Sequence, residues 1–122
     1  YLKNLGRETV NVAQLCSISG KRDGLELVTW LEYFEDDEEG IVYQGGNAPD
    51  KNTHKYFERY PETVSYDLEN MVAYENKIYD LHPGDVKKFT LITWVDSNDP
   101  DFTESILGGS IRFEIYFSLF RR

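Results

Sequence analysis

The clearest pattern in the chain is an alternation of apolar and polar residues near its end. Between Ser110 and Leu119 every second residue is apolar: Ile111, Phe113, Ile115, Phe117 and Leu119. Successive side chains of a β-strand point to opposite faces of the sheet, so this period of two predicts a strand with one face toward the core. A helix would distribute the same residues around its whole circumference.

Four earlier segments are also predicted to be strands, and one of them, residues 41–44, would complete a hairpin with the segment before it. Residues 89–95 are apolar and rich in β-branched and aromatic side chains, and residues 8–15 alternate in polarity. Residues 25–34 are interpreted as a strand because Val, Thr, Trp, Tyr and Phe dominate them. Residues 54–60 show no clear period, and residues 64–74 fit a helix and a strand equally well.

Turn residues separate these segments. Pro83 presets its φ angle and Gly84 adopts positive φ readily, so residues 81–85 are predicted to form a type II turn. Strands divided by glycine and proline turns, with no regular helical period, are typical of an all-β fold. We therefore predict an antiparallel two-sheet sandwich, jelly-roll-like, that forms a single domain over residues 1–122.

Composition excludes several functions. The formal net charge of −9 repels phosphate backbones, so nucleic acid is not an expected partner. No apolar stretch approaches the roughly 20 residues that cross a bilayer, so no transmembrane segment is predicted. Cys16 is the single cysteine, which rules out an intramolecular disulfide, and we expect it to be a small buried hydrophobe. Because Tyr1 is neither an initiator methionine nor part of a signal peptide, we expect that an upstream segment has been removed.

The sequence contains no recognisable catalytic motif. His54 lies in a polar loop and His82 in a proline turn, and neither belongs to a zinc-peptidase motif. A glycosidase would use Glu104 with Asp99 or Asp101, but 22 acidic residues bring such pairs together by chance. We therefore predict that the protein is not an enzyme and has no resident cofactor.

Calcium is the one metal that the sequence suggests. Five side chains of the loop before the last strand carry hard oxygen ligands: Asp96, Asn98, Asp99, Asp101 and Glu104. Their spacing differs from an EF-hand, because Pro100 stands at the third ligand position and the required glycine is missing. The apolar residues of this loop, Phe102, Ile106 and Leu107, are expected to pack against the edge of the sandwich. A second acidic block, residues 35–40, is interpreted as a solvated loop, with calcium binding as the alternative.

Both ends of the chain resemble a known family. The stretch Thr-Trp-Val-Asp-Ser-Asn-Asp-Pro-Asp-Phe-Thr-Glu-Ser-Ile-Leu-Gly-Gly at residues 93–109, followed by an alternating strand, resembles the end of camelysin/TasA-like proteins, which are exported with SipW-type signal peptides. Residues 1–10 resemble the group's early Lys-Asn-x-Gly strand, and residues 81–85 resemble its Pro-Gly turn. Relatives often have a cysteine where this chain has Phe102, so the resemblance implies no disulfide there.

The resemblance implies a jelly-roll sandwich that is secreted and has a structural role in extracellular matrix fibres, biofilm or appendages. Camelysin has been described as a peptidase, but this chain has no ligand set for that activity. The family's sandwich normally starts with an N-terminal strand, and this chain is expected to begin after it. A missing strand leaves an edge that a neighbouring subunit can fill, so we predict self-association into an oligomer or filament. The predicted contacts are Val10 and Val12 in the first strand and the exposed Tyr116 and Phe120 in the last.

The alternative is a β-sandwich module that binds carbohydrate or a surface partner. Six tyrosines are concentrated in the middle of the chain: Tyr43, Tyr56, Tyr60, Tyr66, Tyr74 and Tyr79. Aromatic rings on a sheet face stack well on sugars. The competing interpretation is that these tyrosines are packing residues whose hydroxyls reach water.

Overall fold

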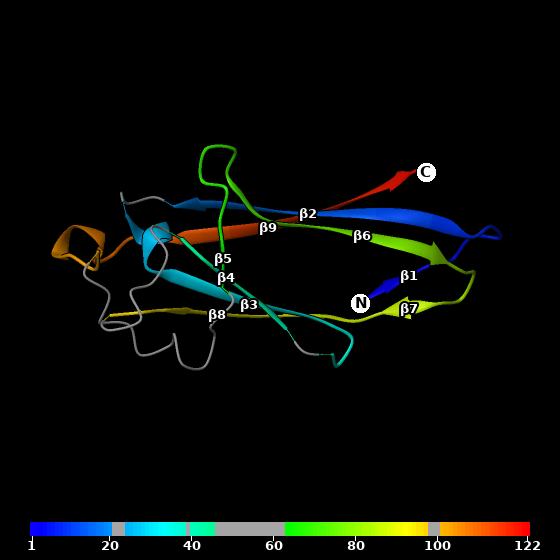
Figure 1. The fold of residues 1–122 in the computed structure, drawn as a ribbon, viewed down its shortest axis with the longest axis horizontal. Coiled ribbons are helices and arrows are strands. Elements are labelled where there is room, and N and C mark those ends of the chain that lie inside the picture. The colour runs from blue at the N-terminus through cyan, green and yellow to red at the C-terminus, as the bar shows by residue number, and fades with distance from the viewer. Residues whose placement is uncertain (21–23, 39, 46–62, 98–100) are drawn as a thin grey trace.

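The computed structural model describes residues 1–20, 24–38, 40–45, 63–97 and 101–122. These residues form two β-sheets packed face to face, which confirms the predicted all-β sandwich (Figure 1). Both chain ends lie at the end of the sandwich where a short pair of strands, β1 and β7, is found (Figure 1).

The first sheet has three antiparallel strands in the order β6-β2-β9. Their bounds are Val10–Gly20 for β2, Val72–Leu81 for β6 and Ile111–Phe120 for β9. The central strand β2 pairs with β6 through two register shifts, but with β9 through an unbroken ladder from Asn11↔Phe120 to Gly20↔Ile111. The terminal strand predicted from the alternation is therefore confirmed.

The second sheet has four strands in the order β5-β4-β3-β8. Their bounds are Thr29–Glu35 for β3, Ile41–Gln44 for β4, Val64–Ser65 for β5 and Phe89–Val95 for β8. β3 pairs antiparallel with β4 and β8, whereas β5 runs parallel to β4, so this sheet is mixed. Outside the two sheets, β1 (Leu2–Lys3) pairs with β7 (Val86–Lys87), and the short 3₁₀ helices η1 and η2 cover Leu25–Leu27 and Glu104–Ile106.

The predicted strand over 25–34 is wrong at its beginning. Gly24 has a φ of 92° and turns the chain into η1, so the strand starts only at Thr29. Burial explains the difference, because Leu25 packs in a cluster with Val28 and Ile106 instead of continuing the sheet. The hydroxyl of Thr29 donates a hydrogen bond to the carbonyl of Leu25 at 2.7 Å.

Two other local predictions are settled by the structure. The turn at 81–85 forms as expected, since Gly84 has a φ of 85° and the amide of Asp85 donates to the carbonyl of His82. The ambiguous segment 64–74 contains β5, a turn and the start of β6, and no helix. The segment 54–60 lies outside the described residues.

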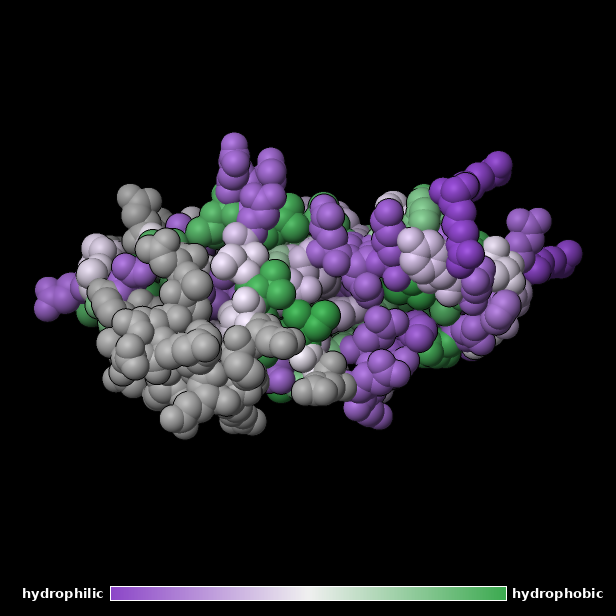
Figure 2. All heavy atoms as spheres, in the orientation of Figure 1, coloured by the Kyte–Doolittle hydropathy of each residue, from purple (hydrophilic) through white to green (hydrophobic). Residues whose placement is uncertain are grey.

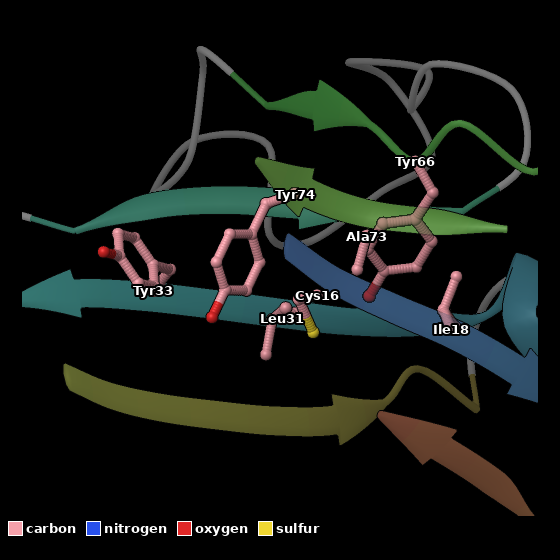
Figure 3. Packing of buried hydrophobic residues seen from close by; sticks show 7 residues of the cluster. All are labelled: Cys16, Ile18, Leu31, Tyr33, Tyr66, Ala73 and Tyr74. Atoms are coloured by element: carbon pink, nitrogen blue, oxygen red, sulfur yellow. The ribbon is translucent and has the colours of Figure 1, made fainter. Parts of the chain in front are cut away.

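The main core lies between β2 of one sheet and β3 of the other, and it includes residues that flank them (Figure 3). Its buried members are Cys16, Ile18, Leu31, Tyr33, Tyr66, Ala73 and Tyr74. Cys16 is completely buried, as predicted. A buried side chain that leaves water contributes on the order of 1.5 to 3 kcal/mol for the larger apolar types, so this cluster accounts for much of the stability of the fold.

Asn4 fastens the N-terminal segment to the sandwich. Its side-chain amide donates hydrogen bonds to the carbonyls of Glu8 at 2.8 Å and Leu81 at 2.9 Å. Its Oδ1 accepts a hydrogen bond from the amide of Gly6 at 2.9 Å. Its backbone bonds to residues of the turn after β6, because its amide donates to Asp85 and its carbonyl accepts from Gly84. One buried residue therefore connects β1, the start of β2 and the turn that leads to β7.

Replacing Asn4 should destabilise the fold. Asn4→Ala leaves the carbonyls of Glu8 and Leu81 without their partner, and an unsatisfied buried polar group costs about 1 to 3 kcal/mol. Urea unfolding should show this loss in the free energy of unfolding. The adjacent control Leu5→Ala removes a side chain that is 85% exposed, so it should change that free energy by less than about 0.5 kcal/mol. Equal effects of the two substitutions would contradict the role given to Asn4.

Candidate functional site

The apolar interior of the sandwich is open along β9. The register places Leu119 opposite Val12 and Ile115 opposite Cys16, so the apolar side chains of β9 point toward the core. Val12 and Cys16 are buried, but Ile115 is 39% exposed, Phe117 44% and Leu119 70%. Side chains on the core-facing side of β9 are therefore only partly covered by the opposite sheet.

Among the described strands, β9 and β8 each lie at a sheet edge that lacks most of the features that usually protect an edge. β9 has no proline, its ladder has no bulge, and the core-facing residues from Ile111 to Leu119 include no charge. β8 also contains no charged residue. At the opposite edges, β6 carries Glu75, Lys77 and Asp80, and β5 has only two residues. β9 also has two charged residues, both on its outward face, so the difference between the edges is one of degree: the edges at β6 and β5 are better protected than those at β9 and β8.

The opening between the two sheets is narrowest where β8 and β9 are in contact through two aromatic rings. The ring of Phe89 on β8 lies 5.9 Å from the ring of Phe117 on β9. Beyond this contact, a pocket of about 580 Å³ lies between β9 and the N-terminal segment. Its lining includes Leu2, Leu5, Val10, Leu81, Phe117 and Leu119. On the face seen in Figure 2, hydrophobic side chains also reach the surface between polar ones.

The outward face of β9 carries a short polar chain of contacts. The guanidinium Nε of Arg112 lies 2.7 Å from Oε1 of Glu114. The hydroxyl of Tyr116 donates a hydrogen bond to the same carboxylate, and this bond raises the pKa of Tyr116. Tyr116 is 52% exposed, as the sequence predicted. Phe120 was also predicted to be exposed, but it is half-buried because its ring packs edge-on against Tyr79 at 5.5 Å.

The other two residues of the predicted assembly contact lie away from any edge. Val10 and Val12 belong to β2, whose backbone pairs with β6 on one side and β9 on the other. Val12 is also buried among Ile78 and Leu81. No edge of β2 is free to accept a further strand, so the available edge in this sheet near these residues is that of β9.

The predicted calcium ligands are not brought together in the described part of the chain. Asp96 is buried, whereas Asp101 and Glu104 are exposed, and Asn98 and Asp99 lie outside the described residues. No group of three or more His, Cys, Asp or Glu side chains within the described ranges could hold a metal ion. Calcium binding stays a prediction.

Of the loop's apolar residues, Ile106 is buried and Phe102 packs against it as expected, but Leu107 is 56% exposed.

The acidic block after β3 is balanced by lysines. Lys87 lies 3.4 Å from Glu35 and 3.3 Å from Asp36, and Lys88 lies 3.5 Å from Asp37. The amide of Lys88 also donates to the carboxylate of Asp36, which lowers the pKa of Asp36 together with the two lysine charges. These contacts tie the β3–β4 turn to the start of β8.

The tyrosines of the middle region do not form one exposed surface. Tyr66 and Tyr74 are buried in the core, and Tyr43 packs against Tyr74 with ring centroids 5.7 Å apart. Tyr79 is 48% exposed, and Tyr56 and Tyr60 lie outside the described residues. The packing interpretation is therefore confirmed for Tyr66 and Tyr74.

A buried hydrogen-bond network explains why these tyrosines are tolerated in the core. Gln14 donates to the hydroxyl of Tyr74 at 2.9 Å and accepts from the hydroxyl of Tyr33 at 3.2 Å. Asn76 in turn donates to the hydroxyl of Tyr33 at 2.9 Å. Burial raises the pKa of Tyr33 and Tyr74, so their hydroxyls stay protonated and act as donors and acceptors in this network.

Comparisons of the chain with protein-family models, curated proteins and solved structures found no match. No helix in the described residues is long and apolar enough to cross a membrane. Among the described residues, the open edge at β9 is the feature that bears most directly on function.

The burial of Cys16 predicts how the stability of the protein changes at alkaline pH. Burial raises the pKa of Cys16 from its ordinary 9.0 to about 11. The unfolded thiol then loses its proton first, so the stability that Cys16 contributes is complete below pH 9 and is lost as the pH rises toward 11. The difference in unfolding free energy between the native protein and Cys16→Ala should fall by about 2 kcal/mol between roughly pH 8 and pH 11.

Cys16 contributes to the raised pKa of Tyr66 and Tyr74, but burial is the larger cause and is common to both proteins, so most of the tyrosine titration cancels in this comparison. A thiol reagent at about pH 8 should label Cys16 only after unfolding, because the native thiol is buried and protonated. A difference in stability that is constant with pH, or rapid labelling of the native protein, would contradict the buried protonated thiol.

Proposed function

We propose that this protein is a non-enzymatic extracellular structural subunit that assembles into a fibre, appendage or matrix through its β-strand edges. The observation that supports it is the combination found at β9. A long, unprotected sheet edge lies next to core-facing side chains that are 39% to 70% exposed. An edge of this kind is a ready template for pairing with another chain.

The energies favour an association that depends on concentration. Covering Ile115, Phe117 and Leu119 more fully contributes on the order of 1 kcal/mol each, since full burial of such a side chain contributes about 1.5 to 3 kcal/mol. Each backbone hydrogen bond of an added ladder contributes a net 0.5 to 1.5 kcal/mol, roughly. Association costs on the order of 4 kcal/mol or more in lost translation and rotation. The three side chains together contribute about 3 kcal/mol and fall short of this cost, so the association also depends on the hydrogen bonds of the ladder.

A fibre needs at least two contacts on each subunit, and the chain has two unprotected edges to supply them. β9 offers one and β8, from Phe89 to Val95, offers the other. These strands belong to different sheets, so subunits joined at both edges extend the assembly instead of closing it. The extracellular location is part of the proposal and is supported by the resemblance of the two chain ends to secreted matrix proteins.

A charge placed on the open edge should block assembly. Leu119→Lys puts an inward-pointing charge on β9, a device that prevents strand addition. Sedimentation velocity over a range of concentrations, with electron microscopy of the same samples, should show oligomers and filaments for the native protein and monomers for Leu119→Lys. The matched control Ile41→Lys makes the same change of charge at a residue 46% exposed on β4, and it should assemble normally.

Circular dichroism of both variants checks that each is folded. A native protein that stays monomeric at high concentration, without filaments at any salt concentration or pH, would overturn the proposed function. Equal loss of assembly in Leu119→Lys and Ile41→Lys would overturn the assignment of the contact to β9.

A further inference from the structure

We infer that β9 pairs antiparallel with β9 of a second copy of this chain, across a two-fold axis that passes through Ile115. This inference rests on the proposed function and names the partner and the register of its first contact. The pairing would join two three-stranded sheets into one six-stranded sheet with the order β6-β2-β9-β9-β2-β6. It needs no new element, because the free edge of β9 meets the same edge of the other copy.

The core-facing residues of β9 read almost the same in both directions. Starting from Ile115, the next core-facing residue is phenylalanine on either side, at Phe113 and Phe117, and the one after it is aliphatic, at Ile111 and Leu119. A two-fold axis requires this kind of self-complementarity, since each residue meets its mirror position in the other copy. Aromatic pairs and β-branched pairs across strands are among the favourable ones.

The axis at Ile115 also covers the side chains that are most exposed. Leu119, 70% exposed, would lie opposite Ile111 of the second copy, and Phe117 would lie opposite Phe113 of the second copy. All core-facing positions of the strand then have an apolar neighbour across the new ladder. These side chains are exposed in the single chain because the neighbours that would cover them belong to the second copy.

Charge decides the direction of the pairing. Arg121 and Arg122 follow the end of β9, and Arg122 already forms an ion pair with Asp80 at 2.9 Å, whereas the exposed Asp101 and Glu104 precede the start of β9. In an antiparallel pair, the arginines at the end of one β9 lie near the acidic residues that precede the other β9. The two-fold axis produces this attraction at both ends of the pair. A parallel pair would place Arg112 of one copy beside Arg112 of the other.

Charge and strand length also decide the register. An axis at Glu114 would place two Glu114 side chains opposite each other, and an axis at Phe117 would place Arg112 opposite Arg122 of the second copy; like charges directly opposite are destabilising. An axis at Tyr116 would leave Ile111 without an apolar neighbour across the ladder. With the axis at Ile115, Arg112 faces Ser118 and Glu114 faces Tyr116 of the second copy, so no like charges meet.

Disulfide trapping tests this register directly. Arg112→Cys and Ser118→Cys are each made in a Cys16→Ala background, mixed in equal amounts at a concentration where sedimentation shows association, and oxidised. Directly opposed residues have Cβ atoms about 4.5 to 5.5 Å apart, close to the spacing that a disulfide requires. In either variant alone the two cysteines would be about 20 Å apart, since six residues separate them along the strand.

The mixture should therefore give at least about five-fold more cross-linked dimer than either variant alone. A Glu114→Cys and Ser118→Cys mixture is the matched control, because these residues are opposed only if the axis is at Tyr116. More cross-linking in that control, or association without Arg112–Ser118 cross-linking, would overturn the inference and leave the proposed function standing. Cross-linked dimers that never form filaments would support the inference and overturn the fibre. A protein that does not associate at all would overturn both.

Discussion

Within the described part of the chain, β9 forms a hydrogen-bonded ladder on one side only, and this determines where a further strand can be added. Its ladder to β2 is unbroken from Asn11↔Phe120 to Gly20↔Ile111, so the strand is straight and firmly held on that side. On its other side, no described strand pairs with it. Backbone amides and carbonyls at such an edge form hydrogen bonds either with water or with another chain. The apolar side chains next to this edge favour another chain.

The remainder of the structure holds this edge in place. The buried network of Gln14, Tyr33 and Tyr74 fixes β2 relative to β3 and β6, because each polar group in it has a partner. Asn4 and the lysines before β8 fasten the N-terminal segment and the acidic turn to the same end of the sandwich. Because β9 is already ordered before it pairs, adding a strand to it costs less conformational entropy.

Much of the fold could be predicted from local patterns. The alternation from Ile111 to Leu119 correctly assigned the faces of β9, because side-chain direction in a strand depends only on the backbone period. The Pro83-Gly84 turn followed from the φ angles that these residues prefer. Leu25 was assigned wrongly because a buried cluster with Val28 and Ile106 overrode strand propensity.

The candidate site was harder to predict for a physical reason. A period of two shows which residues share a face, but not whether an opposite layer covers that face, so the exposure of Phe117 and Leu119 had no signal in the sequence. Strand order has the same limit. Nothing local shows that β2 is central, and this is why Val10 and Val12 were expected at an edge that β6 and β9 in fact occupy.

Hydrogen–deuterium exchange of the backbone amides, measured at low and at high protein concentration, would show whether the edge of β9 is open in the monomer and covered on association. The β9 amides that point away from β2 should exchange rapidly in the dilute protein and become protected as the concentration rises, whereas those that donate to β2 should be protected in both samples. Amides along the free edge of β6 should exchange at the same rate in both samples, because its charges prevent pairing. Protection that appears at β6 instead of β9, or protection in the dilute monomer of the β9 amides that point away from β2, would contradict an open β9 edge.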